Sequence, residues 1–256
     1  MALLASLKSN IFFVVKLGIA FFANAYNLLV IDFAMSILDQ LNIQDPYGLG
    51  FGLWTNSLLA SATSAGANFG MLCFGFIADH LGRQLAVILT GILVISGSVG
   101  SSLCQRSDNF PLVSQLLICQ VVLGVGIGGE YPLSATIASE CSDPKLRTKI
   151  VGLVFSMQGF GMMVSCLLPI ILLRAGVSLE VTWRLLLGLG SVPAFVAFCL
   201  RLKTPQKQVS SDLQPRSSAF SRIRLVWSPL LGCMLCWFLS DVTFYGTGRF
   251  KHAIQQ

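Results

Sequence analysis

Long apolar runs recur along this chain, and their length constrains the fold more than any other feature. A helix needs about 20 apolar residues to cross the roughly 30 Å hydrocarbon core of a bilayer. The composition agrees, because only 11% of the 256 residues are charged, whereas a soluble domain averages about 25%. We therefore predict an all-α membrane protein whose spans cover 11–38, 54–78, 85–104, 112–139, 150–173, 183–201 and 227–248.

The net charge of +6 is distributed unevenly between the predicted connections. The N-terminus and every second connection are basic, with Lys8, Lys16, Arg83, Lys145, Arg147, Lys149, Arg201, Lys203, Lys207, Arg216, Arg222 and Arg224. The other connections hold only Arg106, Arg174 and Arg184. Because cytoplasmic connections carry the excess of Lys and Arg, the N-terminus is predicted to be cytoplasmic. The positive charge thus indicates topology in a lipid bilayer and argues against a nucleic-acid partner.

The sequence offers no chemistry that is typical of an enzyme. Its cysteines lie almost entirely within apolar runs, where a thiol behaves as a small hydrophobe. Cys233 and Cys236 have CxxC spacing, but they lie in a predicted span without the usual strand–helix context. The glycines of GVGIGG, starting at Gly124, likewise do not follow a strand. We expect no cofactor, no metal and no enzymatic activity, since no nucleophile–base pair is evident.

Three segments of the chain differ in composition. Residues 1–201 form a predicted six-span bundle, 202–226 are polar and basic, as in a flexible cytoplasmic linker, and 227–256 hold the seventh span and the C-terminus. Within the bundle, Gly124 and Gly128 are four residues apart and share one helix face. We predict that they serve close helix packing, as small residues do in membranes.

The connection between the second and third spans has the sequence GFIADHLGRQ. It resembles the G-x-x-x-D-R/K-x-G-R-R/K loop of the major facilitator superfamily, although His80 and Gln84 replace two basic residues. The resemblance implies a conformational latch against a helix of a second bundle, formed by Gly75, Asp79, Gly82 and Arg83.

Three further motifs narrow the resemblance. GIGGEYPLSA begins at Gly126, FSMQG at Phe155 and WFLSDVTFYG at Trp237. In this order they resemble the phosphate:proton symporter family of the superfamily. The resemblance covers almost the whole chain, which corresponds to the six-helix N-terminal bundle and the seventh span of such a transporter. It implies transport of inorganic phosphate together with protons.

The polar residues of these motifs lie at matching positions in their spans. Tyr131 and Gln158 are equally far from the cytoplasmic edges of their predicted helices, about 12 Å into the membrane. Three residues of the seventh span recur at every fourth position and so share one face. The resemblance implies that the phosphate site is lined by Tyr131, Gln158, Trp237, Asp241 and Tyr245.

Two acidic residues lie within predicted spans, where ionisable side chains normally face the bundle interior or a wet pathway. Asp241 is the first, and because an ionised carboxylate repels phosphate, phosphate binding favours its protonated form. Glu130 precedes Tyr131 and is the second expected proton carrier. A structural contact between helices is the alternative role for both acids.

The sequence departs from the family at three buried charged positions. Asn24 and Asn27 stand where the family has aspartates, and Gln120 replaces an arginine. An amide forms hydrogen bonds but does not exchange a proton. Losing the acids alone would leave a buried arginine without a counter-charge. The joint loss therefore predicts proton coupling that is weak or absent.

Several interpretations stay open at this point. Alternating access moves two bundles against each other, so transport would require a second transporter half, a homo-oligomer or a longer parent chain. A carrier of another small anion, an organic ion or a sugar is one alternative. A non-transporting truncated protein that associates with a full-length relative is another. The resemblance implies a location in the plasma membrane.

Overall fold

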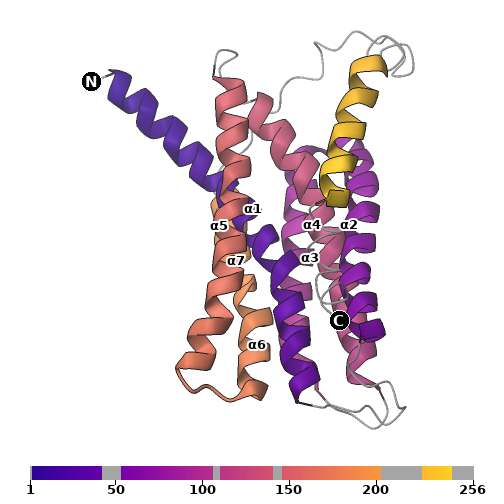
Figure 1. Ribbon diagram of the computed structural model, residues 1–256. Coiled ribbons are helices and arrows are strands. Elements are labelled where there is room, and N and C mark those ends of the chain that lie inside the picture. The colour runs from indigo at the N-terminus through magenta and orange to yellow at the C-terminus, as the bar shows by residue number, and fades with distance from the viewer. Residues whose placement is uncertain (1, 42–52, 106–109, 141–145, 203–226, 244–256) are drawn as a thin grey trace. The chain divides into compact units, whose positions relative to one another are not determined.

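The computed structural model describes residues 2–41, 53–105, 110–140, 146–202 and 227–243. Figure 1 shows the helices coloured along the chain. They are α1 (Ala2–Gln40), α2 (Leu53–Leu81), α3 (Arg83–Leu103), α4 (Leu112–Glu140), α5 (Arg147–Arg174), α6 (Leu179–Leu189), α7 (Ser191–Leu202) and a further helix over 227–243. The described residues include no strand, which confirms the all-α prediction.

The chain divides into two compact units, Met1–Gln206 and Lys207–Gln256. The first unit holds α1 to α7. The second contains the helix over 227–243. The predicted linker lies outside the described residues, apart from Leu202 at the end of α7.

The predicted spans of the first unit are confirmed, with edges that move by a few residues. Within the described part of the chain, six stretches are long and apolar enough to cross a membrane: Val14–Gln40, Ser57–Leu81, Arg83–Leu103, Leu112–Ser139, Arg147–Arg174 and Leu179–Leu202. The last of them combines α6 and α7, which meet at Gly190.

Helices α1 and α4 organise the first unit. Helix α1 packs along α5 and also contacts α6 and α7, while α4 packs against both α2 and α3. Figure 1 shows α2, α3 and α4 running alongside one another. A smaller contact joins α1 to α4. The two groups of helices meet mainly where α3 packs against α6 and α7, and where α4 contacts α5.

Glycines allow α2 and α4 to approach without side chains between their backbones. A Cβ atom on Gly128 would overlap the backbone of Ala67, and one on Gly124 would overlap that of Thr63. A Cβ atom on Gly66 of α2 would likewise overlap the backbone of Val121 in α4. Small residues permit this contact in a membrane, where no hydrophobic force drives helices together. The predicted packing role of Gly124 and Gly128 is confirmed.

A tight turn joins α2 to α3 within the predicted latch. Gly82 alone separates the two helices, and its φ of 92° lies in the left-handed region that favours glycine. Asp79 is exposed near the end of α2, and Arg83 begins α3. A Cβ atom added to Gly75 would meet no other atom within 4 Å, so packing does not require a glycine there. The conformation of the turn thus explains why position 82 is a glycine. The role of the four residues as a latch stays a prediction.

Several arginines that we predicted in connections lie within helices. Arg184 belongs to α6 and pairs with Glu180 at 3.0 Å. Arg201 lies in the last turn of α7 and is only 6% exposed. Counting these two arginines with the connections was wrong, since both lie within the span that the sequence predicted over 183–201. A guanidinium is compatible with a packed helix when it is paired. The basic residues of α5 lie in its end turns, at Arg147, Lys149 and Arg174.

Candidate substrate site

Tyr131 lies on α4 where three helices converge. Its ring meets Phe21 of α1 edge-on, with ring centroids 5.1 Å apart and planes at 85°. Phe21 also contacts Phe155 of α5, at a centroid distance of 4.6 Å. Aromatic rings favour such edge-on and tilted contacts. Tyr131 is only half-buried, so these contacts fix its ring without enclosing the whole side chain.

Gln158 lies on α5, three residues after Phe155. Side chains three positions apart are neighbours on a helix surface, and Gln158 is half-buried. Phe21 therefore connects the helices that carry Tyr131 and Gln158. A shared pocket for phosphate between these two side chains stays a prediction.

The other predicted phosphate contacts belong to the second unit. Trp237 and Asp241 lie on the helix over 227–243, four positions apart and thus on one face. Tyr245 lies outside the described residues. The convergence of these residues with Tyr131 and Gln158 also stays a prediction.

Glu130 takes part in a buried charged cluster between α4 and α7. Its carboxylate forms an ion pair with the guanidinium of Arg201. Nη2 of Arg201 also donates a hydrogen bond of 2.9 Å to Oγ of Ser134. Glu130 is 4% exposed, and burial of such charges is tolerated when they are paired. Glu130 thus forms a structural contact between two helices, which was the alternative to its expected role as a proton carrier.

Arg201 belongs to this cluster, although its charge had predicted a place in a connection. It was assigned to a connection because it begins a run of basic residues. The spacing of Ala194, Ala197 and Arg201 was the available signal, since these positions share one helix face and are the buried residues of α7. Helical spacing was therefore a better guide to Arg201 than its charge.

Gln120, where the resemblance implies an arginine, is hydrogen-bonded to neutral partners. Its Oε1 accepts a hydrogen bond of 2.9 Å from Thr63 of α2. Its Nε2 donates to Oγ of Ser101 of α3, at 3.3 Å. Gln120 is fully buried. The network therefore joins three helices without any charge.

The two asparagines of α1 are also buried. Nδ2 of Asn27 donates to the carbonyl oxygens of Ala23, at 3.0 Å, and Gly190, at 3.3 Å. Neither amide atom of Asn24 has a hydrogen-bond partner among the described residues. A buried polar group without a partner costs about 1–3 kcal/mol. Asn27 thus fits its surroundings, whereas Asn24 carries a penalty.

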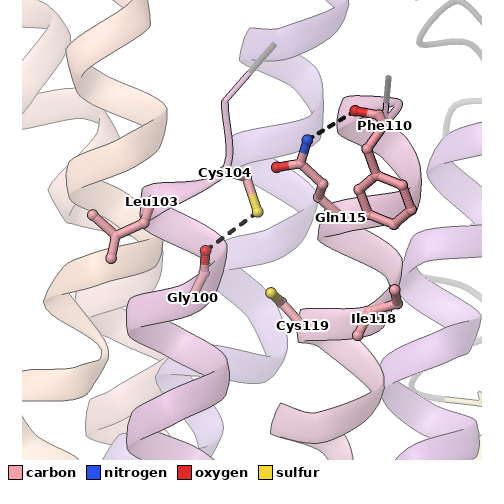
Figure 2. A pocket seen from close by; sticks show the side chains of 7 residues that line it. All are labelled: Gly100, Leu103, Cys104, Phe110, Gln115, Ile118 and Cys119. Carbon is pink, nitrogen blue, oxygen red and sulfur yellow. Dashed lines mark hydrogen bonds between the residues drawn. The ribbon is translucent and has the colours of Figure 1, made fainter. Parts of the chain in front are cut away.

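A separate hollow of about 270 Å³ lies between the neighbouring ends of α3 and α4 (Figure 2). Gln115 donates to the carbonyl oxygen of Phe110 at its rim. The Cys104 thiol donates to the carbonyl oxygen of Gly100 at 3.2 Å. Burial, and then the neighbouring Cys119 thiol, raises the pKa of Cys104 to about 12. None of the predicted site residues lines this hollow.

The family model of the sugar (and other) transporters matches residues 13–207, which include α2 to α7 and most of α1. The chain belongs to this family. It is a membrane transporter family of the major facilitator superfamily, so the superfamily predicted from GFIADHLGRQ is confirmed. The chain is accordingly an integral, multi-pass membrane protein.

Curated relatives confirm the resemblance to phosphate transporters. The chain is 34% identical to the inorganic phosphate transporter PT2 of Toxoplasma gondii, over 89% of this chain and 41% of that protein. It is 28% identical to the low affinity inorganic phosphate transporter 4 of Medicago truncatula, over 91% of this chain and 54% of that protein. The chain thus spans about half the length of the curated relatives it matches.

Solved structures agree on the fold. The proton:xylose symporter XylE, bound to 6-bromo-6-deoxy-D-glucose, matches with a TM-score of 0.67 and 20% identity. The match covers 78% of this chain and 46% of XylE. The inward-open xylose transporter XylE from E. coli matches with a TM-score of 0.66 and 18% identity, over 77% and 48% of the two chains. At these identities the likeness concerns the fold alone.

Proposed function

We propose that this chain forms the N-terminal part of an inorganic phosphate transporter and supplies much of its substrate site. The observation that carries the proposal is the contact of Tyr131 with Phe21, which joins α4 to α1 and, through Phe155, to α5. Gln158 lies on the same side of α5 as Phe155. The phosphate-transporter names of the curated relatives support the choice of substrate.

The proposed contacts have the chemistry that an oxyanion requires. The phenol of Tyr131, the amide of Gln158 and the indole of Trp237 all provide hydrogen-bond donors. Tyr245 adds a second phenol. Asp241 accepts rather than donates when ionised, so phosphate binds best when Asp241 carries a proton. Proton uptake at Asp241 would in this way favour phosphate binding.

We propose that proton coupling is weaker in this chain than in its relatives. Gln120 pairs with two hydroxyl groups, and Asn27 with two carbonyl groups. These neutral partners suit amides, and Asn27, at a position where the resemblance implies an aspartate, has no carboxylate to exchange a proton. Asp241 and Glu130 are the two remaining proposed proton carriers. Glu130 could exchange a proton only after separating from Arg201.

Transport by this fold requires a second helix bundle. Alternating access moves one bundle against the other around a site near the membrane midplane. We propose that the bundle of α1 to α7 works with such a partner, supplied by a second transporter half or a second copy of this chain. The distribution of basic residues supports a cytoplasmic N-terminus. The resemblance supports a location in the plasma membrane.

A neutral solute such as a sugar is the second candidate substrate. The three buried amides favour it, because they replace two acids and an arginine of the phosphate family. The similarity in fold to xylose transporters is compatible with this alternative. A phosphate site and a sugar site can be distinguished by which ligand competes for binding, because phosphate is an anion and a sugar is neutral.

The test is equilibrium binding of radiolabelled phosphate to the purified chain in lipid nanodiscs. Tyr131→Phe removes one donor to a charged ligand and should weaken phosphate affinity about tenfold. Gln158→Ala should do the same. Tyr26→Phe is the matched control, because the Tyr26 hydroxyl donates to the carbonyl oxygen of Leu186 within the core, at 2.8 Å. It should leave phosphate affinity unchanged.

Competition separates the candidate substrates. Unlabelled phosphate should displace the label, whereas xylose should not. Displacement by xylose would favour the sugar alternative. Unchanged affinity in both Tyr131→Phe and Gln158→Ala would contradict the proposed site.

A further inference from the structure

The ion pair of Glu130 and Arg201 includes a third residue of α4. Arg201 reaches from the end of α7 and contacts Glu130 through Nη1 and Ser134 through Nη2. All three residues are buried. A guanidinium group holds its donors in a rigid planar fork. Arg201 therefore fixes two positions of α4 that are four residues apart.

The turn of α4 between these two positions is weakened by a proline. Pro132 lies inside α4 and has no backbone N–H, so the carbonyl of Gly128 lacks its usual helical donor. A proline inside a helix commonly causes a kink at this point. Glu130 and Ser134 flank Pro132 on either side. The fork of Arg201 thus bridges the turn in which the backbone ladder is interrupted.

Tyr131 belongs to the same turn of α4. Its ring packs against Phe21 of α1, while the neighbouring Glu130 is held by α7. A change in the bend at Pro132 would move the Tyr131 phenol relative to α1 and α5. The contact with Arg201 therefore bears on where this phenol lies.

We propose that Arg201 is a positioning residue, which braces α4 across Pro132 through Glu130 and Ser134 and thereby places Tyr131 for phosphate binding. The effect of Arg201 on phosphate binding rests on the proposed function. The brace itself is a property of α4 and is measurable without any ligand.

The choice of variants follows from the burial of both charges. Removing one partner leaves an uncompensated buried charge, whereas replacing both by neutral residues of similar size is often tolerated. The test variant is therefore Glu130→Gln combined with Arg201→Met. Arg184→Met is the matched control, because it breaks the more exposed pair of Arg184 with Glu180 on α6. It should change neither α4 nor phosphate affinity.

The first measurement is hydrogen–deuterium exchange of the full chain in nanodiscs. If Arg201 braces α4, the double variant should exchange about tenfold faster at the amides around Pro132, with α5 as the internal reference. The Arg184→Met control should show no such change. An unchanged exchange rate around Pro132 in the double variant would overturn the proposal, whatever the chain binds.

The second measurement is a double-mutant cycle on phosphate affinity. The Glu130→Gln/Arg201→Met variant should weaken binding about tenfold, as should Tyr131→Phe. Because Arg201 acts through Tyr131, combining all three changes should weaken binding no further than Tyr131→Phe alone. Arg201→Lys keeps the charge but not the fork, so it should fall between the wild type and the double variant.

The outcomes separate this inference from the proposed function. Phosphate binding by the wild type with unchanged affinity in the double variant would overturn the positioning role and leave the function standing. Fully multiplicative losses would show that Arg201 acts independently of Tyr131 and would also overturn it. A flattened pH dependence of affinity in the double variant would instead assign Glu130 as a proton carrier. Absence of phosphate binding by the wild type would overturn the proposed function and the effect on phosphate, while the exchange experiment would still decide the brace.

Discussion

Arg201 of α7 forms a buried ion pair with Glu130 of α4, although the two residues are 71 positions apart in the chain. Each had been assigned a separate role from the sequence, Glu130 as a proton carrier and Arg201 as a topological charge. The pair explains how an acid can lie among apolar residues of α4, because its counter-charge comes from another helix. Ser134 supplies a further partner for the guanidinium.

The first prediction concerns the stability of this pair. Arg201→Met should lower the free energy of unfolding by about 3–5 kcal/mol, because it leaves the Glu130 carboxylate buried without a counter-charge. Adding Glu130→Gln should restore most of that loss. Thermal unfolding in detergent, followed by circular dichroism, measures both. An Arg201→Met variant as stable as the wild type would contradict the burial of the pair.

The second prediction concerns the contact between α2 and α4. Gly128→Ala should destabilise the protein by about 1–3 kcal/mol, because the added Cβ overlaps the backbone of Ala67 and forces the helices apart. Gly159→Ala is the matched control on α5, where an added Cβ meets nothing within 4 Å. Thermal unfolding of the two variants should differ clearly. Equal effects would show that α2 and α4 are less closely packed than the structure indicates.

The third prediction tests the neutral network around Gln120. Gln120→Arg should be strongly destabilising by itself, because Thr63 and Ser101 offer no counter-charge to a buried cation. Adding Asn24→Asp and Asn27→Asp, which restores the charge pattern of the family, should recover part of the lost stability. The same triple variant should make phosphate binding more dependent on pH than in the wild type. A Gln120→Arg variant of wild-type stability would argue against coordinated loss of the three charges.

The fourth prediction concerns the thiol of Cys104 beside the hollow of Figure 2. Because burial raises its pKa to about 12, the thiolate that reacts with alkylating reagents is scarce at pH 8. Labelling of Cys104 should be slow at pH 8 and should rise with each unit of pH up to about 12. Mass spectrometry of labelled peptides measures this.

Cys119→Ser provides the control for that experiment. The Cys119 thiol is a secondary cause of the raised pKa of Cys104, so its removal should lower this pKa and speed labelling at pH 8. The raised pKa of Cys104 also determines how the stability of the fold changes with pH. A thiol with a raised pKa in the folded state stabilises the fold below its ordinary pKa and loses this contribution as the pH rises toward 12. Rapid labelling of Cys104 at pH 8 would contradict the burial of the thiol.

Much of the helix layout was predictable because membrane spans are encoded locally. Each crossing requires about 20 apolar residues, and the backbone must satisfy its own hydrogen bonds within the segment. The close contact of α2 with α4 was also predictable from the spacing of Gly124 and Gly128. The paired position of Arg201 was not predicted, because its charge was interpreted without regard to its helical spacing with Ala194 and Ala197.

The sequence by itself determined the number and position of the spans in the first unit, the small-residue face of α4 and most of the polar residues within the spans, such as Glu130 and Gln120 but not Arg201. The tertiary structure decided which of these residues meet: Glu130 with Arg201, Tyr131 with Phe21, and Gln120 with Thr63 and Ser101. The physical reason is that crossing a bilayer depends on the composition of one segment. Contacts between polar side chains depend instead on the rotation of each helix about its axis, which is set only when the helices pack together.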